Sequence, residues 1–163
     1  ARCGWARVKF DSGEIRLAPG MALTLNGIAQ GFVADKVADL LRAEGLNRIL
    51  IDTGELSALG PQPDGTPWPV TLDAGAGTLA LADRALATSA PLGTVFDAAG
   101  TVGHILHPAT GRPAPALWKI VSISAPSAAL ADALSTAGCL MTSRAAIVAA
   151  VSAFPSARLE AAV

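Results

Sequence analysis

A carboxylate and a hydroxyl stand four residues apart in the stretch LADALSTAG, Leu130 to Gly138. On a helix this spacing would place Asp132 and Thr136 on one face, one turn apart. A hard cation such as Mg2+ takes oxygen ligands, so the pair could supply part of its shell beside a backbone carbonyl and a substrate phosphate. The alternative is structural, with Asp132 interacting with the helix dipole and Thr136 bonding back to its own helix.

The two histidines of the chain both occur in GHILHPATGRP, Gly103 to Pro113. His104 is predicted near the end of a strand, and His107 at the entrance to a turn. The segment is therefore a second candidate for chemistry. The alternative is a strand followed by a turn that begins at proline, with Thr110 and Gly111 satisfying the turn geometry.

A third candidate is LNGIAQGFVAD, residues 25–35, where a predicted strand ends and a helix begins. Free N–H groups at a helix start favour anions, and a glycine lets the backbone approach a ligand closely. The spacing of Gly27 and Gly31 differs from the dinucleotide fingerprint G-x-G-x-x-G, which argues against a Rossmann site. The alternative is an ordinary strand-turn-helix junction.

A weaker candidate is ALATSAP, residues 85–91, in which a predicted strand ends on Thr88 and Ser89. These hydroxyls could contact a phosphate. The same letters are also a common turn signal, so the segment could simply reverse the chain.

Apolar periodicity predicts the elements that would position these residues. We expect a hairpin over 5–17, helices over 28–41, 128–141 and 143–154, and strands over 21–25, 48–54, 68–72, 78–83, 85–89, 102–106, 117–124 and 157–163. Gly45 is the expected stop of the first helix, and Ser127 the expected N-cap of the second. The pattern predicts one α+β domain over residues 1–163, with helices packed on a mixed sheet and the last strand at its edge.

Composition limits the classes of function. The chain has 163 residues, enough for one domain, and no apolar stretch of the roughly 18 residues that a membrane-spanning helix needs. A net charge of -1 gives no basic surplus for nucleic acid, so an anionic ligand must be met by local geometry or a metal. Cys3 and Cys139 form no disulfide framework, and Cys139 is expected in the core. The start, ARCGWARVKF, shows no signal-peptide pattern, so we expect a processed start or a piece of a longer chain.

Six segments in a fixed order carry a family resemblance: LNGIAQGFVAD, ILIDTGELSALG, DGTPWPV, ALATSAP, HILHPATGRP and LADALSTAG. Together they resemble the ApbE family of flavin transferases over nearly the whole chain. The last two are the most specific, because they are similar to the family patterns H-I-x-D-P-x-T-G-x-P and A-D-A-L-S/A-T. The resemblance implies an ApbE-like, T-fold-related architecture. It also implies that this chain corresponds to the later portion of the family's sequence and lacks a counterpart of its N-terminal portion.

The resemblance implies a Mg2+-dependent enzyme that transfers FMN from FAD to a threonine of a target protein and releases AMP. Asp132 and Thr136 match the family's metal-binding acid and hydroxyl, and Gly27 matches a third ligand, a backbone carbonyl. His104 matches a histidine near the scissile phosphates, where it would take the acceptor's proton or hold the phosphate. A pyrophosphate needs neutralising charge, and a chain without a Lys/Arg cluster must obtain that charge from a metal.

The same resemblance implies further contacts and partners. The acceptor would be a flavoprotein subunit of a redox complex, in a periplasmic or membrane-tethered setting, with no nucleic acid and no transmembrane segment in this chain. The residues implied to contact FAD are Gly27, Gln30, Gly31, Thr88, Ser89, His104, Thr110 and Gly111.

Three positions differ from the family pattern and leave other functions open. His107 precedes Pro108 where the family has aspartate, Gln30 stands in place of a frequent lysine, and Ala90 follows Thr88-Ser89 in place of glycine. His107, Ala90 and the short N-terminal part motivate a flavin-binding relative without catalysis, and the short N-terminal part alone motivates an inert structural fragment. A hydrolase that cuts FAD with water, an FAD pyrophosphatase, is a further alternative.

Overall fold

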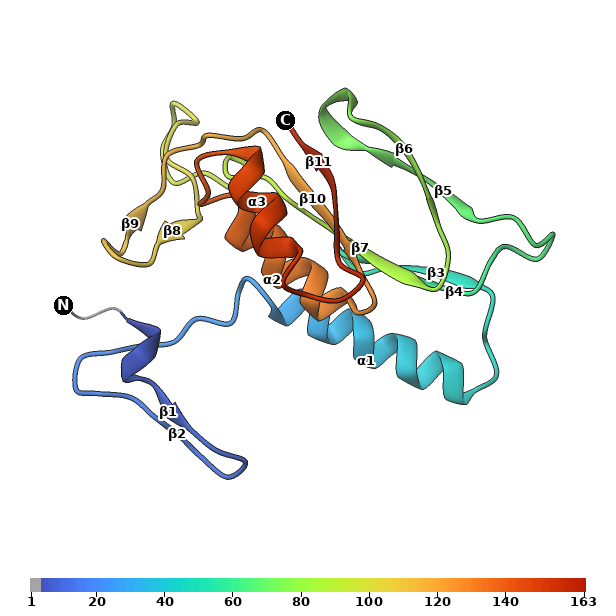
Figure 1. The fold of residues 1–163 in the computed structure, drawn as a ribbon, viewed down its shortest axis with the longest axis horizontal. Helices are drawn as coiled ribbons and strands as arrows, with labels where there is room; N and C mark the ends of the chain where they lie inside the picture. Colours follow the sequence, from blue (N-terminus) through green and yellow to red (C-terminus); the bar gives the residue numbers. More distant parts are fainter. Residues whose placement is uncertain (1–3) are drawn as a thin grey trace.

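The computed structural model describes residues 4–163, and its central element is a five-stranded sheet (Figure 1). The strands lie in the order β11-β10-β7-β4-β3, and every neighbouring pair is antiparallel. Their bounds are β3 (Ile49–Asp52), β4 (Leu56–Leu59), β7 (Arg84–Ser89), β10 (Val121–Ala125) and β11 (Arg158–Ala162).

Three helices cover one face of this sheet, and a hairpin covers the other. Helix α2 packs on β7 and β10, α1 packs on α2 and β4, and α3 packs on β11. The helices are α1 (Ala29–Ala43), α2 (Ala128–Gly138) and α3 (Arg144–Val151), and the hairpin strands are β5 (Trp68–Leu72) and β6 (Gly77–Leu81), joined by η2 (Asp73–Gly75). The result is a three-layer arrangement with the sheet in the middle.

The pleat of β7 separates the two faces. Ala85 packs with Ala34 and Ala128 on the helix side. Leu86, the next residue, packs with Val70 and its neighbours on the hairpin side. Successive side chains of a strand point to opposite faces, so odd-numbered residues of β7 face α1 and α2. Small alanines on that side let the helices approach the sheet closely.

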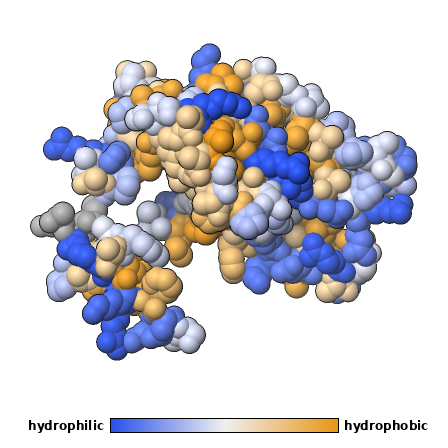
Figure 2. All heavy atoms as spheres, viewed as in Figure 1, coloured by the Kyte–Doolittle hydropathy of each residue, from blue (hydrophilic) through white to orange (hydrophobic). Residues whose placement is uncertain are grey.

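The N-terminal segment stands apart from the body of the molecule (Figures 1 and 2). A 3-10 turn, η1 (Trp5–Arg7), leads into a two-stranded hairpin, β1 (Lys9–Phe10) and β2 (Ile15–Arg16), whose residues are all exposed. The predicted hairpin over 5–17 is therefore confirmed at its turn, with shorter strands. Among the described residues, no helix combines the length and apolarity needed to span a bilayer.

The predicted α+β class is confirmed, but the described sheet is antiparallel and not mixed. Neighbouring parallel strands need a crossover connection, commonly a single helix. Here two helices, α2 and α3, connect β10 to β11, and the chain returns in the opposite direction. Strand β11 lies at the edge of the sheet, as expected.

The three helices form where the sequence predicts them. Ser127 and Ser143 cap α2 and α3, since their hydroxyls accept from the N–H of Leu130 and Ala146. Helix α1 ends just before Gly45, which has a φ of +82°.

Two predicted strands are wrong. Residues 21–25 form no strand, because no neighbouring strand pairs with them. In 102–106 the pairing shrinks to one bridge between Val95 and Gly103, and a separate hairpin, β8 (Leu106–His107) and β9 (Arg112–Pro113), follows. The strand expected over 117–124 begins only at Val121.

Cys139 is buried, as predicted, in the cluster between β10, α2 and α3. Burial raises the pKa of its thiol to about 12, which makes it unreactive at neutral pH. Cys3 lies outside the described residues.

Candidate functional site

Asp132 lies on α2, buried at the contact between α2 and the start of α1. The residue is only 4% exposed, and its Oδ2 accepts a hydrogen bond of 3.1 Å from the backbone N–H of Gly31. Burial raises the pKa of this carboxyl, and the Gly31 N–H acts in the opposite direction. The acid that the sequence singled out is therefore held in place by a residue 101 positions away.

Glycine permits this close approach of the two helices. A Cβ on Gly31 would lie 2.3 Å from the carbonyl oxygen of Ala128, a backbone atom that cannot move aside. The two carboxylate oxygens of Asp35 accept from the N–H groups of Ala128 and Ala129, at 2.7 and 2.9 Å. Asp35 thereby satisfies free donors at the start of α2 and fixes α1 against it.

Gly27 meets Thr136 at the same contact. A Cβ on Gly27 would lie 2.9 Å from Cγ2 of Thr136 and 3.3 Å from its Oγ1. In a continuous helix the Gly31 N–H would bond to the Gly27 carbonyl, but it donates to Asp132 instead. Within the described chain, no backbone N–H donates to the Gly27 carbonyl. This carbonyl is left available near the Thr136 hydroxyl.

Ser89, at the end of β7, adds a hydroxyl to this group. Its Oγ lies 2.8 Å from Oγ of Ser135 and 3.1 Å from Oγ1 of Thr136. Thr88, which the sequence paired with Ser89, points to the other face of the sheet, where its hydroxyl lies 2.9 Å from that of Ser122. We call Gly27, Ser89, Asp132 and Thr136 the oxygen cluster. Its members come from the α1 start, the end of β7 and α2.

Glu55 is a residue of this region that the sequence reasoning missed. It immediately precedes β4 and is 7% exposed, and its buried Oε2 has no hydrogen-bond partner in the described part of the chain. Burial and, second, the negative charge of Asp132 raise the pKa of Glu55 to about 7, with a smaller contribution from Asp52 and an opposing one from the Thr88 N–H. The sequence feature that could have indicated Glu55 is its position: an acid directly after the Thr53-Gly54 turn and next to a strand of apolar and small residues.

Gln30 joins the region of Glu55 to that of Asp132. A Cβ on Gly54 would lie 2.7 Å from Nε2 of Gln30, so the Gln30 amide lies against the turn that precedes Glu55. Gln30 also precedes Gly31, the donor to Asp132. A neutral amide therefore lies where the resembled family often has a lysine.

His104 lies in the loop between β7 and β8, and its contacts are with that loop. Its Nδ1 lies 3.1 Å from the Thr94 carbonyl oxygen, and its backbone N–H donates to the same oxygen. A carbonyl only accepts, so Nδ1 carries the proton and Nε2 is left as an acceptor. A Cβ on Gly103 would lie 2.1 Å from the Pro91 carbonyl oxygen, and this close approach holds His104 near the end of β7. The structure records no direct contact between His104 and Asp132 or Thr136.

The turn after His107 is built by local hydrogen bonds. The Nδ1 of His107 accepts from the N–H of Ala109 at 3.2 Å, as an aspartate would in an Asx turn. The Thr110 hydroxyl accepts from the N–H of Arg112, and Gly111 has a φ of +65°, which favours glycine. The contacts recorded for Thr110 and Gly111 thus lie within this turn, and their role toward FAD stays a prediction.

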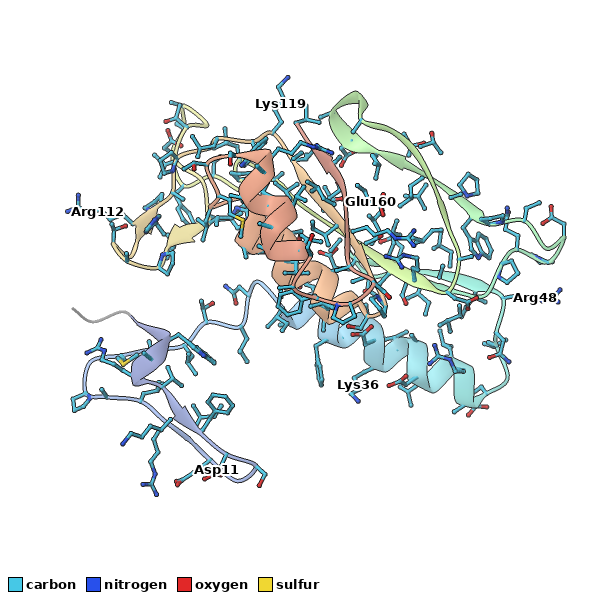
Figure 3. All side chains as sticks on the ribbon, in the orientation of Figure 1. Asp11, Lys36, Arg48, Arg112, Lys119 and Glu160 are labelled. Atoms are coloured by element: carbon cyan, nitrogen blue, oxygen red, sulfur yellow. The ribbon has the colours of Figure 1, made fainter. Side chains whose placement is uncertain are left out.

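No Lys or Arg side chain in the described part of the chain bonds to Asp132 or Glu55. The labelled cations Lys36, Arg48, Arg112 and Lys119 project outward from the edges of the molecule (Figure 3). Within residues 4–163 no group of three His, Cys, Asp or Glu side chains could hold a metal alone. A cation here would need hydroxyl, carbonyl, phosphate or water oxygens beside the carboxylates.

An α+β domain that gathers buried carboxylates and hydroxyls without a basic partner is suited to binding a cation near a phosphate. Comparison with known proteins defines the family: the model of the ApbE family matches residues 1–158, and the chain belongs to that family.

Relatives and solved structures agree with this assignment. The chain is 34% identical to an FAD:protein FMN transferase of Treponema pallidum over 83% of this chain and 44% of that protein. It is 30% identical to the FAD:protein FMN transferase of Escherichia coli K12, over 72% of this chain and 36% of that protein. The ApbE protein of Thermotoga maritima superposes with a TM-score of 0.79 at 29% identity, covering 91% of this chain and 52% of that one. The apo flavinyl transferase ApbE of Pseudomonas stutzeri superposes with a TM-score of 0.71 at 32% identity, covering 84% of this chain and 45% of that one. The matches thus cover between 36% and 52% of the length of these proteins.

Proposed function

We propose that this chain forms part of an FAD:protein FMN transferase that needs Mg2+ and releases AMP. The observation that carries the proposal is the oxygen cluster, in which three distant segments of an ApbE-family chain bring a carboxylate, two hydroxyls and a free carbonyl together. The acceptor is a threonine of another protein.

The cluster fits Mg2+ in donor type and charge. Its donors are all oxygens, and Oδ1 of Asp132 accepts no hydrogen bond within the described chain. We assign Asp132, Thr136 and the Gly27 carbonyl as the protein ligands, with phosphate and water oxygens completing the shell. When bound, Mg2+ would neutralise negative charge on the pyrophosphate of FAD.

The transfer is a displacement at phosphorus. The threonine oxygen bonds to the phosphorus of the FMN half, the bond from that phosphorus to the bridging oxygen breaks, and AMP leaves with the bridging oxygen. We assign the hydroxyl proton to Nε2 of His104, because the Thr94 carbonyl holds the proton on Nδ1. We also propose FAD contacts for Gly27, Gln30, Gly31, Thr88, Ser89, His104, Thr110 and Gly111.

The three departures from the family pattern are compatible with an active enzyme. His107 replaces an aspartate but makes the turn contact that an aspartate would make. Ala90 is not among the described residues of positive φ, so it needs no glycine conformation. Gln30 removes a positive charge without removing any oxygen of the cluster. The structure therefore supplies no specific reason to prefer a flavin-binding relative without catalysis.

The test is AMP release from FAD by the purified chain, with Mg2+ or with EDTA, in the presence of a threonine-bearing acceptor domain. We expect AMP only with Mg2+, and flavin fluorescence on the acceptor after denaturing electrophoresis. AMP without labelled acceptor would identify an FAD pyrophosphatase. Flavin binding without AMP would refute catalysis by this chain on its own. The periplasmic or membrane-tethered setting stays a prediction, tested by fractionating cells that produce the native protein.

A further inference from the structure

We propose that Glu55 supplies a second carboxylate to the cation site formed by the oxygen cluster. The inference rests on the proposed function, since it concerns the same Mg2+ ion. It adds a residue that neither the motif spacing nor the comparisons single out.

The first support is an acceptor without a donor. Among residues 4–163, Oε2 of Glu55 has no hydrogen-bond partner, and the residue is only 7% exposed. Buried polar atoms are almost always paired, because an unpaired one loses its water without compensation. We therefore expect a hydrogen-bond donor or a cation to bind at this oxygen.

The second support is position. Strands β4 and β7 pair with Leu56 opposite Leu86, so continuing the register by one residue places Glu55 opposite Ala87. Ala87 faces α2, where it packs with Ala131, the neighbour of Asp132. Glu55 thus lies at the layer between the sheet and α2 that also contains Asp132.

The third support is charge. Asp132 and Glu55 lie close enough for their negative charges to interact, and no Lys or Arg in the described chain pairs with either. Two neighbouring buried carboxylates without a counterion are unfavourable, and a divalent cation relieves both at once. Mg2+ is commonly held by one or two carboxylates together with phosphate oxygens. A substrate hydroxyl would satisfy Oε2 but would leave the charge unbalanced.

The test uses Mg2+ alone, without FAD, so that it is independent of transfer. We would follow the melting temperature and the heat of binding during Mg2+ titration of the wild-type chain, Glu55→Gln and Glu44→Gln. Glu44 is exposed at the end of α1, so its substitution removes the same charge away from the site. We expect Glu55→Gln to weaken Mg2+ binding about 10- to 100-fold, the usual effect of losing a group that supports a metal site. Glu44→Gln should match the wild type.

A purely structural role would give a different result. Glu55→Gln would then change the melting temperature in EDTA but leave the Mg2+-dependent increase at its wild-type size, which would overturn the inference. Glu55→Asp keeps the charge on a shorter side chain, so it should bind Mg2+ more tightly than Glu55→Gln; equal affinities would also overturn it.

Failure of the proposed function would look different again. Loss of Mg2+ binding in Asp132→Asn with full binding in Glu55→Gln would remove Glu55 from the site and leave the proposed function in place. No Mg2+ binding by the wild-type chain would refute both.

Discussion

The raised pKa of Glu55 makes the stability of this chain depend on pH in a defined direction. The pKa is about 7 in the folded protein, against 4.5 for the ordinary side chain. Between these values the folded protein holds a proton that the unfolded chain has released, so the free energy of unfolding decreases as pH rises from about 5 to 7. The shift corresponds to about 3 kcal/mol, and we expect ionisation of this carboxylate to cost about 1–3 kcal/mol.

Substituting glutamine for Glu55 removes this cost, because the amide keeps the shape and carries no charge. We expect Glu55→Gln to gain stability relative to the wild type by about 1–3 kcal/mol more at pH 8 than at pH 5. For a chain of this length that corresponds to a gain of a few degrees, up to about 10 °C, in melting temperature. Urea unfolding at pH 5, 6, 7 and 8 in EDTA would measure it without any contribution from bound metal.

The comparison with a second variant isolates the buried carboxylate. Glu44→Gln should show a difference from the wild type that does not change across this pH range, because Glu44 is exposed. The pKa of Asp132 is also raised, but Asp132 is present in both proteins, so its contribution to the free energy of unfolding largely cancels in the difference. A stability difference between Glu55→Gln and the wild type that stays constant from pH 5 to 8 would refute the reasoning.

Three other substitutions test separate parts of the structure. Asp132→Asn should lower Mg2+-dependent AMP release by about 100-fold or more. The melting temperature should change little, because the amide oxygen can still accept the hydrogen bond from the Gly31 N–H. Unchanged AMP release would exclude Asp132 as a ligand. Gly31→Ala should cost about 1–3 kcal/mol or more in urea unfolding, because its Cβ would meet the α2 backbone, whereas Gly13→Ala, in an exposed turn, should cost little. His107→Ala should lose about 0.5–1.5 kcal/mol while His107→Asp keeps the turn, and equal losses would contradict the Asx-like contact.

The helical part of the site could be predicted from the sequence because its signals are local. Asp132 and Thr136 are one turn apart on a helix that Ser127 caps, and each of these features depends only on residues close together in the sequence. The glycine junction before α1 was also visible. The strand predicted before it, over residues 21–25, was wrong, because this segment has the composition of a strand but pairs with no neighbouring strand.

The rest of the site depends on contacts that no local pattern encodes. The hydrogen bond from Gly31 to Asp132 joins residues 101 positions apart. Glu55 is buried beside β4, which lies between β3 and β7, and that strand was not predicted from its short run of apolar and small residues. The loop that holds His104 depends on a tertiary contact between Gly103 and Pro91, so its strand-like sequence forms only an isolated bridge.

The small residues where α1 meets α2 explain how an acid and a hydroxyl come to lie at one helix contact. Gly31 lets α1 approach the backbone of α2, since a Cβ there would lie 2.3 Å from the Ala128 carbonyl oxygen, and a Cβ on Gly27 would crowd the Thr136 side chain. Burial raises the pKa of Asp132, which lies at this contact, and also that of Glu55, which lies beside β4. Because no Lys or Arg among the described residues pairs with either acid, their two negative charges are costly together, and binding of a divalent cation would relieve that cost and stabilise the fold. Cation binding and helix packing should accordingly weaken together when either glycine is substituted.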